Sequence, residues 1–278
     1  MSKQMAVIQQ RFEQAMVAAI GAVNGGQLET AADICKDILR GRSNDPAAHQ
    51  LLAVISLHQQ KLTDAFRHIS CSLAGRPDHT PSLLIAGRIA LTLQDLEAAF
   101  GFFERAAACT PQEPEPVYQM GSILIEQGKL TLAVDVLVGF VQLHPSHAPA
   151  WCRLGAALHQ SGMQERAEDA LERAIALDKN QADAWFYMGL LRQDKGKFAS
   201  AETAFKAALE LRPDFAEAAV NLGIVLQEDA RVDEALTVYR TAYKLRPTAF
   251  GRIANALVSR PHGRMWIDLN QLRQLLSA

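Results

Sequence analysis

The chain has 278 residues, of which 49% are hydrophobic and 21% are charged, and its formal net charge is −2. This near balance of acidic and basic residues creates no strong positive field, so nucleic acid is not an expected partner. No stretch approaches the ~20 apolar residues of a membrane-spanning helix, and the first ten residues do not read as a signal peptide. We therefore expect a cytoplasmic protein without membrane insertion.

Metal and cofactor chemistry is not indicated by the cysteines and histidines. The cysteines, scattered without a CxxC motif, are Cys35, Cys71, Cys109 and Cys152. This spacing predicts neither a disulfide framework nor a zinc site, so we expect free thiols that are mostly buried. His144 and His147 are close in sequence, but Pro145 between them predicts a loop and no third ligand is near. We expect no metal site and no cofactor.

A fixed spacing of 34 residues organises almost the whole chain. Trp151 and Trp185 are separated by it. The alanines that keep it without an insertion are Ala31, Ala65, Ala99, Ala133, Ala167, Ala201 and Ala235. The glycines that keep it are Gly87, Gly121, Gly155, Gly189 and Gly223. The prolines that keep it, at the ends of the units, are Pro77, Pro111, Pro145, Pro213 and Pro247.

Each unit of this length predicts a hairpin of two helices. In the unit from Ala148 to Asn180, Trp151, Leu154 and Leu158 share one helical face, and Gly162 marks the end of that helix. The same register predicts first helices that begin near Phe12, Pro46, Thr80, Pro114, Ala148, Ala182 and Ala216.

Small residues are predicted at the contact between the two helices of a hairpin. We expect Gly155 and Ala167 to lie where the helices cross, because their lack of side-chain bulk lets the backbones approach. The first unit departs from the pattern, with Ala15 in place of tryptophan and Ser43 in place of proline, although Gly26 keeps its internal turn. Such a departure is typical of a terminal, capping unit.

The C-terminal end predicts an incomplete eighth unit and a final helix. The unit begins at Phe250, and Pro261 and Gly263 interrupt it. An amphipathic helix is expected over residues 264–277, with its apolar face formed by Met265, Leu269, Leu272 and Leu276. We interpret this helix as a cap, and the alternative is a dimer contact through exposed Trp266 and Leu275.

The motif W-x2-L-G, present as Trp151, Leu154 and Gly155, together with A-x3-F…P at the 34-residue period, resembles the tetratricopeptide repeat over residues 12–259. This resemblance implies an all-α fold, an α–α superhelix or solenoid of helical hairpins. The expected organisation is an extension of the first helix over residues 1–11, seven repeats over 12–249, and a degenerate eighth unit with a capping helix over 250–278.

The resemblance also implies a binding surface, because first helices in this family line a concave groove that binds peptides. The candidate groove residues are Arg88, Tyr118, Gln119, Arg153, Phe186, Tyr187, Asn221 and Asn255. We expect Arg153 to grip a carboxylate, and the aromatic members to act as hydrophobic anchors. Asn221 and Asn255 form a two-rung ladder that is expected to hydrogen-bond a peptide backbone.

No catalytic motif is present, since the chain lacks a P-loop, a G-x-S-x-G elbow, an H-E-x-x-H pair and a dinucleotide fingerprint. The sequence therefore predicts a non-enzymatic scaffold or adaptor that binds a peptide segment of a partner protein. Two alternatives stay open. One is an accessory or regulatory subunit of a glycosyl- or sulfotransferase system, and the other is a scaffold that self-associates through its terminal repeats.

Overall fold

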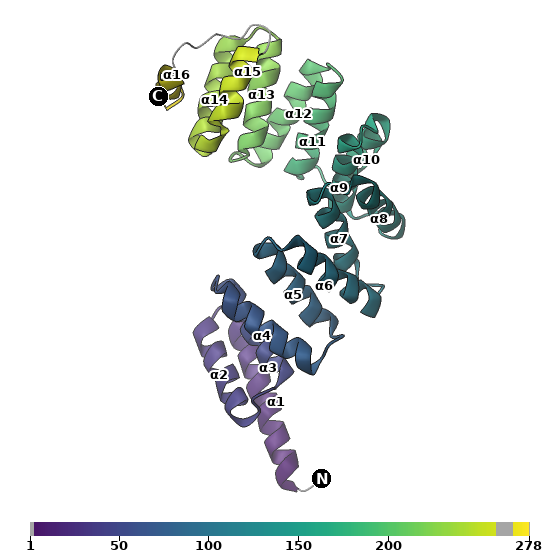
Figure 1. Ribbon diagram of the computed structural model, residues 1–278, viewed down its shortest axis with the longest axis vertical. Coiled ribbons are helices and arrows are strands. Elements are labelled where there is room, and N and C mark those ends of the chain that lie inside the picture. Colours follow the sequence, from purple (N-terminus) through teal and green to yellow (C-terminus); the bar gives the residue numbers. More distant parts are fainter. Residues whose placement is uncertain (1–2, 260–268, 278) are drawn as a thin grey trace. The chain divides into compact units, whose positions relative to one another are not determined.

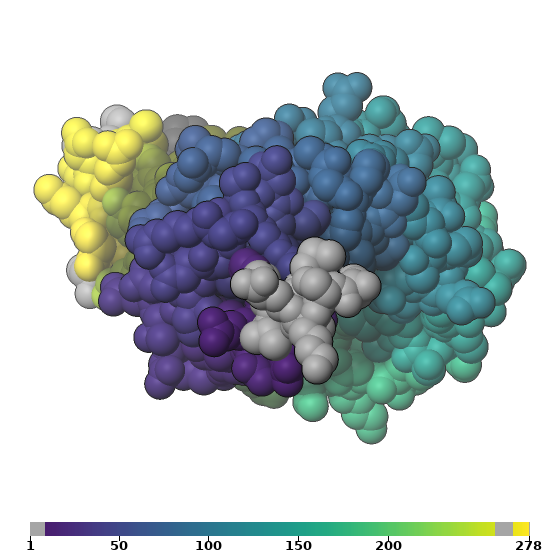
Figure 2. All heavy atoms as spheres, turned by 90° about the horizontal axis from the view of Figure 1, so that it is seen from below, coloured from purple at the N-terminus to yellow at the C-terminus, as the bar shows by residue number. Residues whose placement is uncertain are grey.

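The computed structural model describes residues 3–259 and 269–277, which form two compact units, Met1–Gly128 and Lys129–Ala278. Within the described residues all regular secondary structure is helical, which confirms the expected all-α class (Figure 1). The helices of unit 1 are α1 (Lys3–Asn24), α2 (Leu28–Gly41), α3 (Pro46–His58), α4 (Leu62–Gly75), α5 (Thr80–Thr92), α6 (Leu96–Cys109) and α7 (Pro114–Glu126). In this unit the second helix of one hairpin contacts the first helix of the next. The space-filling view shows its atoms in purple to blue (Figure 2).

Unit 2 continues the same alternation of first and second helices. Its elements are α8 (Leu130–Leu143), α9 (Ala148–Gln160), α10 (Gln164–Leu177), α11 (Ala182–Asp194), α12 (Phe198–Leu211), α13 (Ala216–Glu228), α14 (Val232–Leu245), the short 3-10 helix η1 (Pro247–Ala249), α15 (Phe250–Ser259) and α16 (Leu269–Ser277). The first helices of the second to seventh hairpins begin at the predicted residues. The first helix of the first hairpin, α1, begins at Lys3 rather than near Phe12.

The turns inside the hairpins explain part of this regularity. Gly26 and Gly162 adopt φ values of 73° and 76°, in the left-handed region where a glycine avoids the penalty of a side chain. Gln60 and Ala230 occupy the corresponding position in other hairpins at φ 58° and 60°. The turn geometry is therefore kept even where the sequence does not supply a glycine.

The helices of each hairpin approach closely at the predicted small residues. A Cβ atom added to Gly155 would lie 2.6 Å from Cγ of Leu171 and 3.4 Å from the carbonyl oxygen of Ala167. The same addition at Gly189 would meet the ring of the fully buried Phe205 at 2.6 Å. The crossing predicted from the 34-residue pattern is thus confirmed.

The final helix covers one end of the unit 2 core. Leu272 and Leu276 of α16 are completely buried against it, and Nε of Arg240 on α14 donates a hydrogen bond of 2.9 Å to the carbonyl oxygen of Leu275. This packing is consistent with a capping role for α16, which stays a prediction. Two details were wrong: Leu275 is half-buried rather than exposed, and Leu269 is 53% exposed rather than on the buried face. The other predicted members of this region, Pro261, Gly263, Met265 and Trp266, lie outside the described residues.

The cysteines divide evenly between core and surface. Cys35 and Cys152 are buried, whereas Cys71 and Cys109 are exposed, so the expectation that most are buried was wrong. Cys71 lies on the outward face of α4, and Cys109 is the last residue of α6. All four are free thiols.

Candidate peptide-binding surface

The predicted binding residues of unit 1 lie on α5 and α7. Arg88 forms a bidentate ion pair with Glu115, with Nη2 of the arginine 2.6 and 2.8 Å from the two carboxylate oxygens. Tyr118 and Gln119 are half-buried on α7, where the hydroxyl of Ser122 donates to the carbonyl oxygen of Tyr118. The guanidinium of Arg88 therefore links two successive first helices.

In unit 2, Arg153 on α9 and Tyr187 on α11 interact with each other. Burial raises the pKa of the Tyr187 hydroxyl, while the charge of Arg153 and its hydrogen bond to this hydroxyl lower it. Both side chains are half-buried. Beneath them Cys152 is 3% exposed, and desolvation together with the charge of Asp183 raises the pKa of its thiol to about 12. That thiol is not a nucleophile near neutral pH.

Phe186 is placed differently from the anchor that was predicted. Its ring contacts Phe215 at 4.7 Å, Tyr187 at 5.5 Å and Phe205 at 6.0 Å between centroids. It is half-buried against the main hydrophobic core of unit 2. These contacts make it a packing residue between helices, because much of its apolar surface is already covered.

The predicted ladder of asparagines does not form an accessible pair. Asn221 is only 4% exposed, and its side-chain nitrogen donates to the carbonyl oxygen of Glu217 one turn earlier in α13. The reason is that α13 is covered along nearly its whole length, from Ala218 to Gln227. Asn255 on α15 is exposed. For Asn221 to hydrogen-bond a peptide, its hydrogen bond to the carbonyl oxygen of Glu217 would first have to break.

The sequence reasoning missed a set of arginines that follow second helices. Nη2 of Arg212 pairs with Asp183 at 2.6 Å, Arg246 pairs with Glu217, and Arg76 donates to Gln50 at 3.1 Å. Each arginine lies directly after a second helix and reaches the first helix of the same hairpin. Their signal was present in the sequence, because Arg42, Arg76, Arg212 and Arg246 keep the 34-residue register.

His147 has a structural role at the start of α9. Its Nδ1 atom accepts a hydrogen bond of 3.1 Å from the backbone nitrogen of Ala150, which satisfies one of the free amides of the first turn. No cluster of three potential metal-ligating side chains occurs in the described part of the chain. Nor is any helix of residues 3–259 and 269–277 long and apolar enough to cross a membrane.

The family model described as the cilia and flagella-associated protein 70 C-terminal domain, a tetratricopeptide-repeat domain, matches residues 75–276. The chain belongs to this tetratricopeptide-repeat (TPR) family. TPR hairpins account for the 34-residue period, the small residues at the crossings and the turns after the first helices. The chain is therefore a TPR-type helical repeat scaffold, a fold that implies protein–protein interaction and whose members are typically not catalysts.

Solved TPR structures resemble this chain over much of its length. A TPR protein of Parabacteroides merdae aligns at a TM-score of 0.73 and 16% identity, covering 89% of this chain and 99% of its own. A thermophilic TPR protein of Thermus thermophilus aligns at 0.56 and 26%, covering 65% and 100%. YrrB, described as a TPR protein with an unusual peptide-binding site, aligns at 0.55 and 20%, covering 67% and 96%. No curated protein sequence matches the chain.

Proposed function

We propose that this TPR protein is a non-enzymatic, cytoplasmic adaptor that binds a peptide segment of a partner protein along its first helices. The observation that carries the proposal is the contact between Arg153 and Tyr187 on the successive first helices α9 and α11. The exposed thiols of Cys71 and Cys109 fit a reducing compartment, since a cytosolic protein keeps such cysteines reduced.

The Arg153–Tyr187 pair suits the recognition of a carboxylate beside an apolar group. The hydrogen bond between Arg153 and the hydroxyl of Tyr187 places a positive charge beside an aromatic ring. The nearby carboxylate of Asp183 is engaged by Arg212 at 2.6 Å. We expect a ligand carboxylate to pair with the partly exposed Arg153, while the ring of Tyr187 covers a neighbouring apolar side chain.

A peptide library selected on the full chain tests this proposal. We expect the recovered peptides to share an acidic residue, or a free C-terminal carboxylate, next to an aromatic or aliphatic side chain. Arg153→Ala should weaken their binding by about tenfold or more, because charge-assisted hydrogen bonds contribute roughly 1.5–3 kcal/mol. Glu172→Ala, on the exposed face of the second helix α10, should leave the affinity unchanged. Peptides without an acidic group that bind Arg153→Ala normally would contradict the proposal.

A variant that tests the hydroxyl of Tyr187 must keep the packing of its ring. Tyr187 lies against the cluster of Cys152, Ala174 and Ala184, so Tyr187→Ala removes core contacts and should lower the melting temperature. A loss of binding in Tyr187→Ala would therefore mix a change in stability with the loss of a ligand contact. Tyr187→Phe keeps the ring and removes only the hydroxyl, so it isolates the contact to Arg153.

A further inference from the structure

The second hairpin of unit 1 carries two histidines where a later hairpin carries a tryptophan and an alanine. In the 34-residue register, His49 corresponds to Trp151 and His68 corresponds to Ala170. The indole nitrogen of Trp151 donates a hydrogen bond of 2.9 Å to the carbonyl oxygen of Pro145, six residues earlier. Nε2 of His49 lies 3.1 Å from the carbonyl oxygen of Ser43, also six residues earlier. His49 therefore replaces the indole in a contact that the fold uses repeatedly.

This contact fixes the tautomers of both histidines. A carbonyl oxygen can only accept, so Nε2 of His49 must carry a hydrogen, and Nδ1 of the neutral ring is an acceptor. Nδ1 of His49 lies 3.0 Å from Nδ1 of His68. The neutral His68 must therefore carry its hydrogen on Nδ1 and donate it. The two ring centroids are 5.3 Å apart, and His49 is only 8% exposed.

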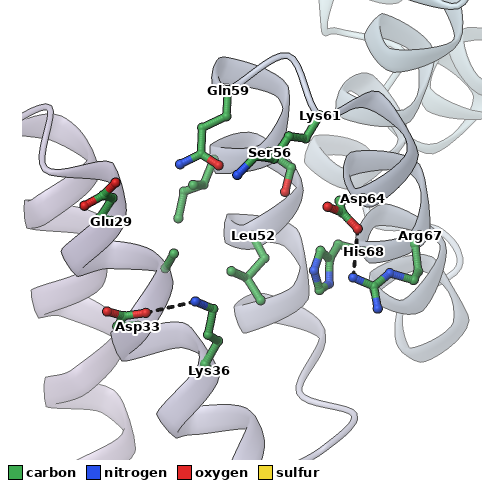
Figure 3. A pocket seen from close by; sticks show the side chains of 12 residues that line it. Glu29, Asp33, Lys36, Leu52, Ser56, Gln59, Lys61, Asp64, Arg67 and His68 are labelled. Carbon is green, nitrogen blue, oxygen red and sulfur yellow. Dashed lines mark hydrogen bonds and ion pairs between the residues drawn. The ribbon is translucent and has the colours of Figure 1, made fainter.

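His68 borders a pocket of about 400 Å³ that is lined by residues of α2, the α3 region and α4 (Figure 3). The charged side chains that line it are Glu29, Asp33 and Lys36 from α2, with Lys61, Asp64 and Arg67 from the α4 side. Lys36 pairs with Asp33 at 2.9 Å and Arg67 pairs with Asp64 at 3.0 Å. The helices α1 and α5, which also contact α3, contribute no side chain to this lining among the described residues. At the start of α3, the Asp45 carboxylate is engaged by the amides of Ala47 and Ala48.

We propose that the His49–His68 contact is a proton-operated joint between α3 and α4, whose hydrogen bond survives one added proton and is broken by a second. With one proton, the pair keeps an N–H⁺···N hydrogen bond, because one Nδ1 donates and the other accepts. With two protons, both Nδ1 atoms carry hydrogen and positive charge at 3.0 Å, and no acceptor remains between them. His49 has little room to turn away, since it is buried and held by Ser43.

The direction of the pH effect follows from the surroundings of His68. Burial lowers its pKa, as do Arg67 and His49, while Asp64 opposes them. A histidine whose folded pKa is lowered binds fewer protons in the folded state than in the unfolded state. Its contribution to stability is therefore complete above the unfolded pKa of about 6.5 and is lost as the pH falls through the folded pKa.

Hydrogen exchange of the full chain at pH 7.5 and pH 5.0, corrected for the intrinsic exchange rate, tests the joint. The comparison variant is His49→Trp with His68→Ala, because this pair of residues already occurs at the same register as Trp151 and Ala170. In the wild type, we expect the opening constant of α3 and α4 to rise by up to about tenfold per pH unit as the pH falls below the unfolded histidine pKa of about 6.5, because the opened hairpin then binds more protons than the folded one. The double variant should show no such rise, and His58→Gln, at an exposed histidine, should behave as the wild type.

A direct measurement on the wild type keeps the proposal testable if the double variant does not fold. Nitrogen-15 chemical shifts of the labelled histidine rings distinguish the two neutral tautomers at pH 8. We expect hydrogen on Nε2 of His49 and on Nδ1 of His68. The opposite tautomer at His49, or equal acid sensitivity of α3 and α4 in the wild type and the double variant, would overturn the proposal.

Discussion

The second hairpin in unit 1 and the fifth hairpin in unit 2 have the same backbone arrangement but different chemistry at one register. In the fifth hairpin the indole of Trp151 donates a hydrogen bond to the carbonyl oxygen of Pro145 and the second register position holds Ala170, while in the second hairpin two imidazoles, His49 and His68, hydrogen-bond to each other. An indole packs identically at every physiological pH, whereas an imidazole pair does not. The TPR backbone therefore fixes where side chains meet and leaves open how the contact responds to its surroundings.

The units also differ in how neighbouring hairpins are joined. In unit 2, Glu168 on α10 pairs with Lys195, and one repeat later Glu202 on α12 pairs with Arg231 at 2.8 Å. At the same register unit 1 carries the uncharged residues Ala32, Phe66 and Phe100. Unit 2 adds ion pairs to its apolar contacts between repeats at positions where unit 1 has no charge to offer.

The largest effect is expected at the end of unit 2 that α16 covers. Leu272→Ala with Leu276→Ala removes two completely buried side chains from α16 and should lower the free energy of unfolding by about 3 to 4 kcal/mol, because large-to-small changes in a core leave cavities. Urea titration of the full chain measures this change. Leu269→Ala, at a side chain that is 53% exposed, is the matched control and should cost less than about 0.5 kcal/mol. Equal losses in the two variants would show that α16 does not cap the core.

The crossing glycines test whether the two units are equally tight inside their hairpins. A Cβ at Gly87 would lie 2.6 Å from the ring of Phe103 in unit 1, and one at Gly189 would lie 2.6 Å from the ring of Phe205 in unit 2. Both rings are fully buried and cannot withdraw, so Gly87→Ala and Gly189→Ala should each cost about 1–3 kcal/mol.

Each crossing glycine has a control in its own unit. Gly101 on α6 and Gly139 on α8 have open space where a Cβ atom would lie, so alanine there should stabilise the chain by about 0.5–1 kcal/mol. Thermal unfolding of the four variants gives the comparison. If Gly101→Ala lowered the melting temperature as much as Gly87→Ala, the loss of stability would not come from the close approach of the two helices at Gly87.

A smaller contrast is expected between the first hairpin and the others. Val17 and Ile20 on α1 are 71% and 45% exposed, and the small buried cluster of this hairpin contains Ala19, Ala31 and Cys35. Since TPR stability is a sum of repeat and neighbour terms, α1 and α2 should open first. Hydrogen exchange should show protection about tenfold lower there than in α11 and α12. Uniform protection along both units would contradict this expectation.

The sequence predicted the hairpins better than the binding surface, for a physical reason. Gly155 and Ala167 mark a crossing because only small residues fit there, so the pattern itself records the contact. The positions of Asn221 and Phe186 on first helices also follow from the register, but their burial depends on how neighbouring helices surround α11 and α13. The 34-residue register of one sequence predicts which face of a helix a residue occupies. It does not predict how deeply neighbouring helices bury that residue.

The smallest effect is expected at the ion pair between repeats in unit 2. Glu168 is 25% exposed and hydrogen-bonds to Lys195, a contact that lowers the pKa of the carboxyl group. Glu168→Gln should cost about 0.5–1 kcal/mol at low salt, and high salt should remove most of this difference because partly exposed charges are screened. Denaturation at two ionic strengths measures it, with Glu172→Gln on the exposed face of the same helix as the control.

The acid dependence of this ion pair has a defined sign. Because the folded pKa of Glu168 is lowered, its contribution is complete above the unfolded pKa of about 4.3 and is lost as the pH falls through the folded value. The wild type should therefore lose its advantage over Glu168→Gln only below about pH 4.5, well below the pH at which a histidine loses its neutral form. Acid titration of both chains thus separates the two kinds of contact: a carboxylate joint in unit 2 and an imidazole joint in unit 1. An advantage that is already lost between pH 7 and pH 5 would show that another group controls the joint of unit 2.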